Sequence, residues 1–204
     1  MPSRVVLTIG HSNHSMADFL SLLKRHQITA LADVRSAPYS RYAPHFNRTR
    51  LVQELRRYEV KYVFLGNELG GRSDDPSCYD HGRVQYARLA QTMSFCCGIG
   101  RVVKGAVSER IALMCAEKDP LNCHRTLLVA PSLIERGVDV QHISSDGSLE
   151  SHHSAMLRLL DMSGPSQAGL FYNTEDLIDE AMTRQEARIA YTDKSLEQES
   201  WIAP

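Results

Sequence analysis

The segment Leu113-Met114-Cys115-Ala116-Glu117-Lys118-Asp119-Pro120-Leu121-Asn122-Cys123-His124-Arg125 joins an apolar run to two thiols, a carboxylate, an imidazole and a guanidinium. The run that begins at Ile111 is typical of a buried strand. Pro120 suits the first position of a helix, with Asp119 or Asn122 as its N-cap. The segment therefore predicts a strand, a short loop and a helix.

The reactive side chains of this segment fall at one end of the predicted strand. Cys115 and Glu117 follow its carboxyl end, and we expect Cys123, His124 and Arg125 in the first turn of the helix. Ligands of open α/β sheets bind at this edge. The helix dipole would favour the thiolate of Cys123, and Glu117 or an anionic ligand would compensate Arg125. In a purely structural alternative, the thiols are buried and an Arg125–Glu117 ion pair fastens the loop.

Five strand-like runs alternate with segments of helical periodicity. They are residues 5–9, 30–34, 61–65, 111–115 and 139–143. This alternation predicts an α/β fold with a mainly parallel central sheet of about five strands and helices on both faces, a three-layer sandwich. We expect an α/β domain over residues 1–150 and a C-terminal helical extension with an acidic tail over residues 151–204.

Local signals place several helices and one long loop. Ser15 and Asp18 form a capping-box pattern, which predicts a helix that ends near His26. Further helices are expected over about residues 49–58, 84–95 and 175–190, and after the cysteine segment, where Pro131 should kink the helix or split it in two. Residues 66–82 are rich in Gly, Asp, Ser and Pro and predict a long loop, which is typical of a functional segment.

The composition indicates a soluble cytoplasmic protein. A chain of 204 residues that is 43% hydrophobic can bury one substantial core. Its apolar runs are too short for a membrane span, and the N-terminal run is too short for a signal peptide, so no membrane partner is expected. The five cysteines form no Cys-x-x-Cys pair, which favours reduced thiols. A net charge of -1 argues against broad, sequence-blind binding to nucleic acid.

Polar side chains also follow the first three predicted strands. They are Gly10, His11 and Ser12 after the first, Asp33, Arg35 and Ser36 after the second, and Gly70, Gly71 and Arg72 after the third. An imidazole near neutral pH can serve as acid or base, a hydroxyl can donate a hydrogen bond, and a Gly-Gly pair lets backbone N–H groups approach an anion. Each group alone is also typical of an ordinary loop or turn. Their convergence on one edge predicts an active site.

A metal site is a weaker interpretation of the same residues. Cys115, Cys123, His124 and His11 are zinc-ligand types, but their spacing matches no compact zinc finger. We therefore predict no resident metal. The sequence indicates neither a cofactor nor an oligomeric state.

Several motifs stand in order along the chain: Thr8-Ile9-Gly10-His11-Ser12, Asp33-Val34-Arg35-Ser36-x-Pro38-x-Ser40, Phe46, Leu69-Gly70-Gly71-Arg72, Cys115-Ala116-Glu117 and Cys123-His124-Arg125. Together they resemble the domain-of-unknown-function 488 family (DUF488). The likeness runs from about residue 5 to residue 143, and Ile189-Ala190-Tyr191 resembles the tail of longer members. The resemblance implies a compact α/β fold and names no reaction, so function must be argued from the site.

A weaker resemblance is to rhodanese and Cys-based phosphatase domains. In those domains an Asp-x-Arg ends an early strand, and a cysteine loop closes with an arginine at a helix start. Asp33-Val34-Arg35 and the stretch from Cys115 to Arg125 follow that layout. The cysteine and the arginine lie about twice as far apart here, however, and the loop lacks glycine, so the resemblance implies the fold and not the mechanism.

The leading hypothesis is an enzyme that binds an anionic small molecule, phosphate-bearing or nucleotide-like, at the sheet edge. Arg35 and Arg125 would clamp the anion, and Cys115 or Cys123 would be the nucleophile. Either His11 or His124 would move protons, with Glu117 orienting one of them.

Two alternatives come from other classes of protein. The first is a nucleic-acid-binding module, in which a basic and aromatic strip contacts phosphates and stacked bases. The strip comprises Arg35, Tyr39, Arg41, Tyr42, His45, Phe46, Arg48 and Arg50. The second is a metal-dependent regulator.

Overall fold

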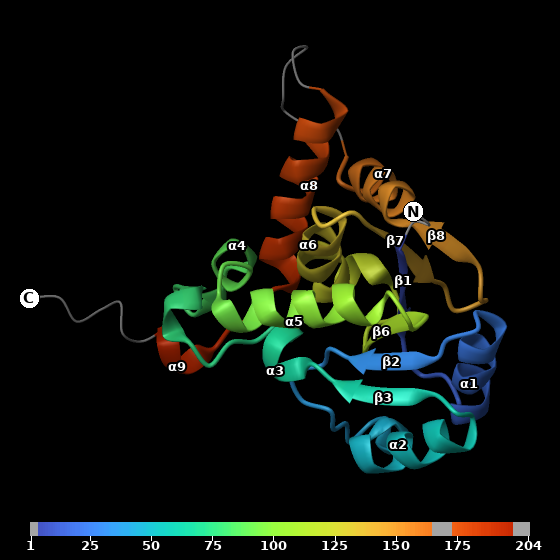
Figure 1. Ribbon diagram of the computed structural model, residues 1–204. Helices are drawn as coiled ribbons and strands as arrows, with labels where there is room; N and C mark the ends of the chain where they lie inside the picture. Colours follow the sequence, from blue (N-terminus) through green and yellow to red (C-terminus); the bar gives the residue numbers. More distant parts are fainter. Residues whose placement is uncertain (1–3, 165–172, 198–204) are drawn as a thin grey trace, which may run out of the picture.

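A mostly parallel sheet forms the centre of the molecule, with helices on both faces (Figure 1). The computed structural model describes residues 4–164 and 173–197. The acidic tail and the predicted C-terminal extension therefore lie partly outside the described residues. The α/β sandwich expected from the sequence is confirmed.

The sheet has six strands in the order β3-β2-β6-β1-β7-β8. Their bounds are β1 Arg4–Gly10, β2 Ala30–Asp33, β3 Lys61–Phe64, β6 Ile111–Cys115, β7 Val138–Ile143 and β8 Leu149–Ser151. The first five are parallel, as expected, and β8 adds an antiparallel edge strand to β7. The register pairs Gly10 with Cys115 and Asp33 with Met114, so the carboxyl ends of β1, β2 and β6 coincide.

Helices α1 (Met16–Arg25) and α2 (Arg48–Arg57) cover one face of the sheet. Leu7 and Ile9 of β1 point to this face and pack in one cluster with Phe19 of α1 and Leu51 of α2. The Ser15 hydroxyl accepts a hydrogen bond from the Asp18 backbone N–H, so the predicted cap of α1 is present.

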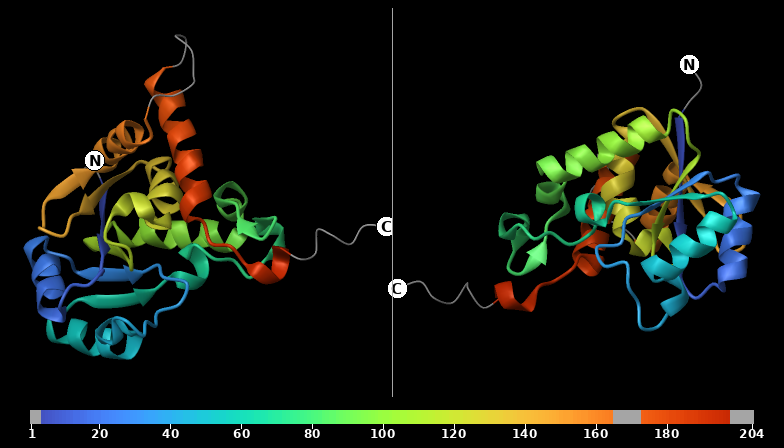
Figure 2. Two further views of the ribbon diagram at one scale, coloured as in Figure 1. Left: turned by 180° about the vertical axis from the view of Figure 1, so that it is seen from behind. Right: turned by 60° about the horizontal axis from the view of Figure 1, so that its bottom comes forward.

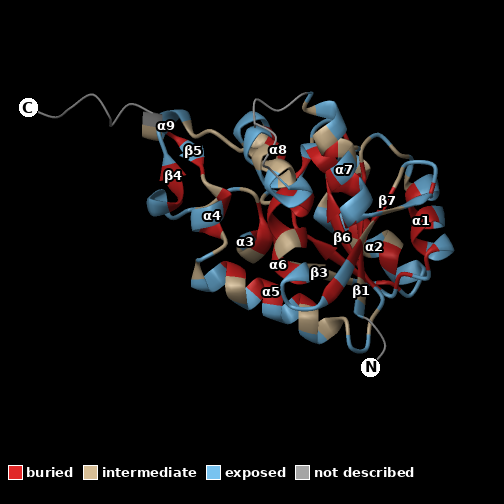
Figure 3. Cartoon of the chain, turned by 90° about the horizontal axis from the view of Figure 1, so that it is seen from above, coloured by how far each residue is buried: buried red, intermediate tan, exposed pale blue. Residues whose placement is uncertain are grey.

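Helices α5 (Met93–Gly105), α6 (Ala130–Ile134), α7 (His152–Met162) and α8 (Thr174–Ile189) lie on the other face (Figures 1 and 2). Val6 and Leu113 point to this side and share a cluster with Ile99 of α5 and Leu133 of α6. The central strands β2 and β6 and most of β1 are buried, whereas the outer faces of the helices are exposed (Figure 3). Among the described residues, no helix is long and apolar enough to span a membrane.

Two predicted segments differ from the structure. Instead of one helix over residues 84–95, the chain forms a hairpin of β4 (Tyr79–Asp80) and β5 (Arg83–Val84), a short α4 (Tyr86–Leu89) and then α5. Met93, which lies within the range of the predicted helix, is 79% exposed because Thr92 caps a new helix at this point. The expected loop over residues 66–82 contains α3 (Gly66–Leu69) and a 3₁₀ turn, Pro76–Cys78.

The remaining short elements are the 3₁₀ turns Pro44–Phe46 and Pro120–Asn122, a π-helical turn Arg125–Val129, and α9 (Lys194–Glu197). The π-helical turn continues directly into α6, where Pro131 lies in the first turn. The helical segment after the cysteines is therefore divided in two just before Pro131, which is one of the two outcomes predicted for this proline.

A chain of buried, neutral side chains crosses the core beside β1. Thr8 Oγ1 lies 2.8 Å from Nδ1 of His142, whose Nε2 lies 3.3 Å from Nδ1 of His152. Burial lowers the pKa of His142 to about 3 and that of His152 to about 4. One directional arrangement satisfies all three groups, with Thr8 donating to His142 and His142 donating to His152.

This histidine pair predicts acid lability. In the unfolded chain both imidazoles take up protons near pH 6.5, whereas in the folded protein they stay neutral until about pH 4. Stability is therefore full above pH 6.5 and falls as the pH drops toward 4, by up to about 1.4 kcal/mol per pH unit for each histidine. Urea unfolding followed by circular dichroism at pH 7 and pH 5 measures the loss. H152Q should reduce the pH dependence and H153Q, at an exposed neighbour, should not; equal slopes in all three proteins would contradict the prediction.

Candidate active site

A cavity of about 360 Å³ opens where β1, β2 and β6 end. Nine of the residues expected from the sequence line it: His11, Arg35, Ser36, Gly71, Arg72, Cys115, Glu117, Cys123 and His124. The sheet register explains the gathering, because strands that are adjacent and parallel end at the same edge.

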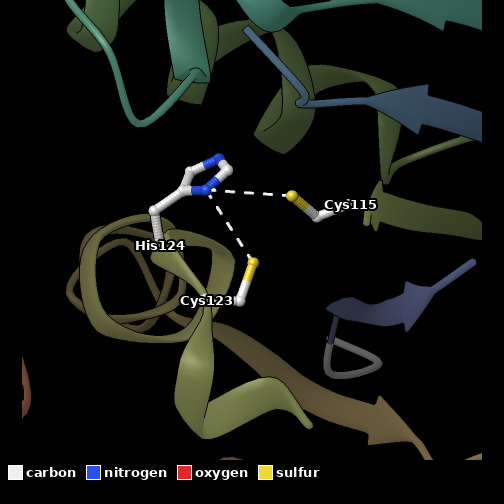
Figure 4. A group of neighbouring side chains, drawn as sticks. All are labelled: Cys115, Cys123 and His124. Atoms are coloured by element: carbon white, nitrogen blue, oxygen red, sulfur yellow. Dashed lines mark hydrogen bonds between the residues drawn. The ribbon is translucent and has the colours of Figure 1, made fainter. Parts of the chain in front are cut away.

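Two thiols converge on one imidazole nitrogen at the floor of the cavity (Figure 4). Nδ1 of His124 lies 3.8 Å from Sγ of Cys115 and 3.8 Å from Sγ of Cys123. The other ring nitrogen, Nε2, lies 3.1 Å from the backbone carbonyl of Val34 and donates to it. This hydrogen bond fixes the ring so that Nδ1 faces both sulfurs.

The loop between the two cysteines differs from the expected helix start. Asp119 caps only a 3₁₀ turn, Pro120–Asn122, through a hydrogen bond from the Leu121 backbone N–H to its side chain. Cys123 then adopts an extended conformation, with φ −143° and ψ 140°, and helical structure begins after His124. Placing Cys123 in the first turn of a helix was therefore wrong.

The charges around the two thiols make them unequal. Burial opposes ionisation of Cys123, but a hydrogen bond from Cys115 and the positive charges of Arg125 and His124 outweigh burial and hold its pKa well below the usual range. The pKa of Cys115 is raised well above the ordinary value by its hydrogen bond to Cys123 and by burial. The pKa of His124 is raised, because the negative charge of Cys123 outweighs burial. The arrangement favours a Cys123 thiolate beside a His124 imidazolium.

Glu117 lies against the same thiolate. Its Oε2 is 3.1 Å from Sγ of Cys123, and burial together with the charge of Cys123 raises the pKa of the carboxyl group. Tyr86 lines the cavity beside this cluster, and burial and the charge of Cys123 raise the pKa of its hydroxyl. Tyr86 therefore keeps its proton near neutral pH, and Glu117 holds its proton to a higher pH than an ordinary carboxyl group does.

Arg125 stabilises the loop rather than the cavity wall. Its side chain is 1% exposed, and its Nη1 and Nη2 donate to the backbone carbonyls of Glu117 and Lys118 at 2.9 and 3.4 Å. It does not pair with the Glu117 carboxylate, and it is not among the residues that line the cavity. Its charge reaches Cys123, but a direct clamp on a bound anion is not supported by this position.

Arg35 is the buried cation that faces the cavity. Its Nε and Nη2 donate to both carboxylate oxygens of Asp33 at 2.9 and 2.7 Å, and Nη2 also donates to the carbonyl of Phe46 at 3.0 Å. Nη1 lies 3.3 Å from Nε2 of His11. Arg35 is thereby held rigidly in the cavity wall.

His11 is suited to positioning rather than proton transfer. Its ring stacks on Phe46 with 4.5 Å between centroids, and Nδ1 donates to the backbone carbonyl of Ser12 at 3.0 Å. Burial lowers its pKa to about 4, so the ring is neutral at pH 7. His11 can accept a hydrogen bond from Arg35 but holds no proton on Nε2 to give as an acid.

Close packing explains the glycines among the expected residues. A β-carbon at Gly10 would overlap the carbonyl oxygen of Glu117, and one at Gly71 would press on the His124 ring. Gly70 packs against Ser36, whose Oγ accepts a hydrogen bond from the Arg72 backbone N–H at 3.2 Å. Gly10, Ser12, Asp33 and Gly70 thus support the wall but do not line the cavity.

Other cavity residues were not expected at this site, and of these Tyr39 had been placed in the basic and aromatic strip. They are Ala37, Tyr39, Ser40, Tyr86, Ala116, Asn122, Ile189 and Tyr191. Ile189 and Tyr191 come from the end of α8 and the segment after it, and the guanidinium of Arg72 lies 4.2 Å from the Tyr191 ring centroid. The resemblance of residues 189–191 to the tail of longer family members was the one signal for them.

The basic and aromatic strip is not continuous. Phe46 is fully buried, where it stacks on His11, so it cannot stack on a base. Arg48 lies over the rings of Tyr62 and Phe64, at 5.9 and 5.1 Å from their centroids. Arg41, Tyr42 and Arg50 are exposed.

A soft metal ion is the cofactor for which the described residues offer ligands. The sulfurs of Cys115 and Cys123 and a ring nitrogen of His124 all lie within 4.8 Å of one another. His11, the fourth ligand considered from the sequence, is not in this group.

The close approach at Gly10 yields a test of the loop geometry. G10A should lower the free energy of unfolding by about 1–3 kcal/mol, because the new methyl group must displace the Glu117 backbone. G100A is the matched control, since Gly100 lies in α5 with open space around its α-carbon. The control should be neutral or stabilising by up to about 1 kcal/mol, as expected for alanine in a helix. Urea denaturation measures both, and equal effects would contradict the tight contact.

Comparison with known proteins identifies the family. No curated protein and no solved structure matches the chain. The family described as "Domain of unknown function DUF488" matches residues 15–130, more than half of the chain, and includes β2, β3 and β6 with both cysteines of the site. The chain belongs to the DUF488 family.

Proposed function

We propose that this protein is an enzyme that acts on a small anionic molecule, with Cys123 as its nucleophile. The observation that carries the proposal is the pairing of Cys123 Sγ with Nδ1 of His124 at 3.8 Å in the wall of a cavity. A thiol beside an imidazole whose other nitrogen is anchored is the arrangement that activates cysteine nucleophiles. The Val34 carbonyl provides that anchor.

The thiols have different roles in this proposal. Cys123 Sγ would attack an electrophilic centre and form a covalent bond to it, while the leaving group departs with the bonding electron pair. His124 would give its Nδ1 proton to that leaving group, and water would later cleave the intermediate with His124 accepting a proton. Cys115 would remain a thiol and donate a hydrogen bond to Cys123, because its own pKa is raised.

The cavity charges favour an anionic substrate. Arg72 lines the cavity together with Arg35, whose charge Asp33 offsets, and a protonated His124 would add further positive charge. Glu117 offsets these charges less than a free carboxylate would, because its pKa is raised. Tyr39, Tyr86 and Tyr191 add aromatic surface, so a phosphate-bearing or nucleotide-like molecule fits the chemistry.

Alkylation with iodoacetamide, mapped by mass spectrometry, tests the nucleophile. Cys123 should react at a pH well below the reference thiol pKa of about 8.5, and Cys115 should react slowly across the neutral range. Inorganic phosphate or a nucleotide should protect Cys123. C123S should abolish the fast reaction while leaving the melting temperature nearly unchanged.

Cys97 supplies an internal reference because it is exposed. Its alkylation should be insensitive to phosphate and nucleotides. If Cys123 reacts only after the protein unfolds, the thiols are structural and the proposed nucleophile is wrong.

A second candidate function, metal binding, is favoured by one geometric observation. Both sulfur–nitrogen distances are 3.8 Å, and about 3.6 Å is expected between ligands at roughly 2.3 and 2.1 Å from a tetrahedral zinc ion. The Val34 carbonyl on the far side of the His124 ring is also the outer contact that metal-binding histidines use.

Elemental analysis of protein purified without added metal separates the two candidates. A metal-dependent protein should carry about one zinc ion per chain and lose it in C115S and in C123S. A nucleophile site should be free of metal after purification and should keep its fast alkylation in the presence of a chelator.

A further inference from the structure

Helix α8 contacts the loop that carries the two cysteines of the site. Gln185, in the C-terminal half of α8, is 5% exposed and donates through Nε2 to the Leu121 carbonyl at 3.0 Å and to Oδ1 of Asn122 at 2.9 Å. These two acceptors directly precede Cys123 and His124 in the chain. A side chain 64 residues away in sequence therefore holds the turn from which the site residues emerge.

The amide of Gln185 has a defined orientation. Arg188, one turn further along α8, lies with Nη1 3.4 Å from Oε1 of Gln185. Because a guanidinium only donates, this contact places the amide oxygen toward Arg188 and the NH₂ group toward the loop. Both hydrogens of that group then have acceptors.

The buried face of α8 makes this glutamine unusual. Ala181 and Gln185 are the residues of α8 that are buried, and an amide on a buried face costs free energy unless it is hydrogen-bonded. An apolar residue of similar size would satisfy packing alone. The polar side chain is explained by its two hydrogen bonds to the turn.

Leu121 anchors the turn by packing in the core, but few other side chains reach the turn through hydrogen bonds. Arg125 holds residues 117 and 118, and Arg158 of α7 contacts Asp119 with both Nη atoms at 3.2 Å. Gln185 supplies the long-range side-chain hydrogen bonds at positions 121 and 122. The α7–α8 extension therefore holds the turn at three of its four positions from 119 to 122.

The chain after α8 continues into the wall of the same cavity. The Tyr191 carbonyl accepts a hydrogen bond from the Val84 backbone N–H at 3.0 Å, and Thr192 forms a bridge with Arg83. This pairing holds the Tyr191 ring against Arg72 in the cavity wall. Figures 1 and 2 show α8 on the α6 side of the sheet, with the chain beyond it running on toward the β4–β5 hairpin.

We propose that Gln185 is a positioning residue that aligns Cys123 and His124 with Cys115 by fixing the Leu121–Asn122 turn. The proposal rests on the proposed function for its chemical consequence, but the hydrogen-bonded turn is a separate and separately testable feature. It also assigns α8 to the active site, although the family match ends at residue 130.

Two variants of Gln185 and one matched control test this role. Q185M keeps the length of the side chain without its hydrogen bonds, and Q185E keeps its shape but presents an acceptor to the Leu121 carbonyl. I178A is the control, because Ile178 packs partly buried two turns earlier on α8 and does not contact the turn through a hydrogen bond. It should lose stability through packing alone.

The first readout is the pH midpoint of Cys123 alkylation by iodoacetamide. A loosened turn also exposes Cys123, and weaker burial would lower the midpoint, whereas lost alignment with Cys115, His124 and Arg125 would raise it, so the two effects have opposite signs. Q185M and Q185E should raise the midpoint by at least about one pH unit toward the ordinary thiol value of about 8.5. I178A should leave it unchanged, and a midpoint in Q185M equal to that in I178A would overturn the proposal.

The second readout does not depend on thiol chemistry. Hydrogen exchange of the Asn122 and Cys123 amides, which donate to Asp119 and Pro120, should accelerate about tenfold or more in Q185M relative to I178A. If the wild-type Cys123 proves unreactive, the proposed nucleophile fails and the exchange rates alone decide the role of Gln185. Equal exchange in the two variants would then refute it.

Discussion

Strand β6 lies between β2 and β1, and this placement determines where the site residues leave the sheet. The parallel registers align Cys115 with Gly10 and Met114 with Asp33. The backbone pairing continues past the strands, where His11 and Ser12 donate to the carbonyls of residues 115 and 116. Polar residues that are far apart in the sequence therefore leave the sheet side by side, and a cavity forms between them.

Charge burial constrains the site as strongly as the sheet does. Arg125 is almost fully buried, and backbone carbonyls satisfy its Nη atoms, yet no carboxylate neutralises it directly. A buried cation in this position favours a negative charge nearby. Cys123 can supply this negative charge as a thiolate. The arginine that holds the loop therefore also lowers the pKa of the Cys123 thiol. One arginine thus contributes to both the fold and the chemistry.

The sequence was sufficient to predict the strands and most of the site because both depend on local patterns. Apolar runs predicted the five parallel strands, and the residues after four of these runs line the cavity or support its wall. The helix over residues 84–95 was misplaced because packing outweighed local helix propensity there. Helix α5 extends through Gly98 and packs on α3 at that residue, where a β-carbon would press on Leu69. Gln185 and Tyr191 were beyond prediction from spacing, since only the tertiary fold brings them to the cysteine loop.

The proposed anionic substrate depends on the charge balance around Cys123. Arg125 and an imidazolium at His124 are two cations beside one Cys123 thiolate, and the raised pKa of Glu117 weakens the second negative charge that would offset them. Arg35 adds little to this balance, because Asp33 binds it in a bidentate ion pair. A zinc ion with two thiolates and a neutral His124 would be neutral as a group and would leave Arg125 as the cation beside it. Under either chemistry, the proposed anionic substrate would add negative charge where cations predominate.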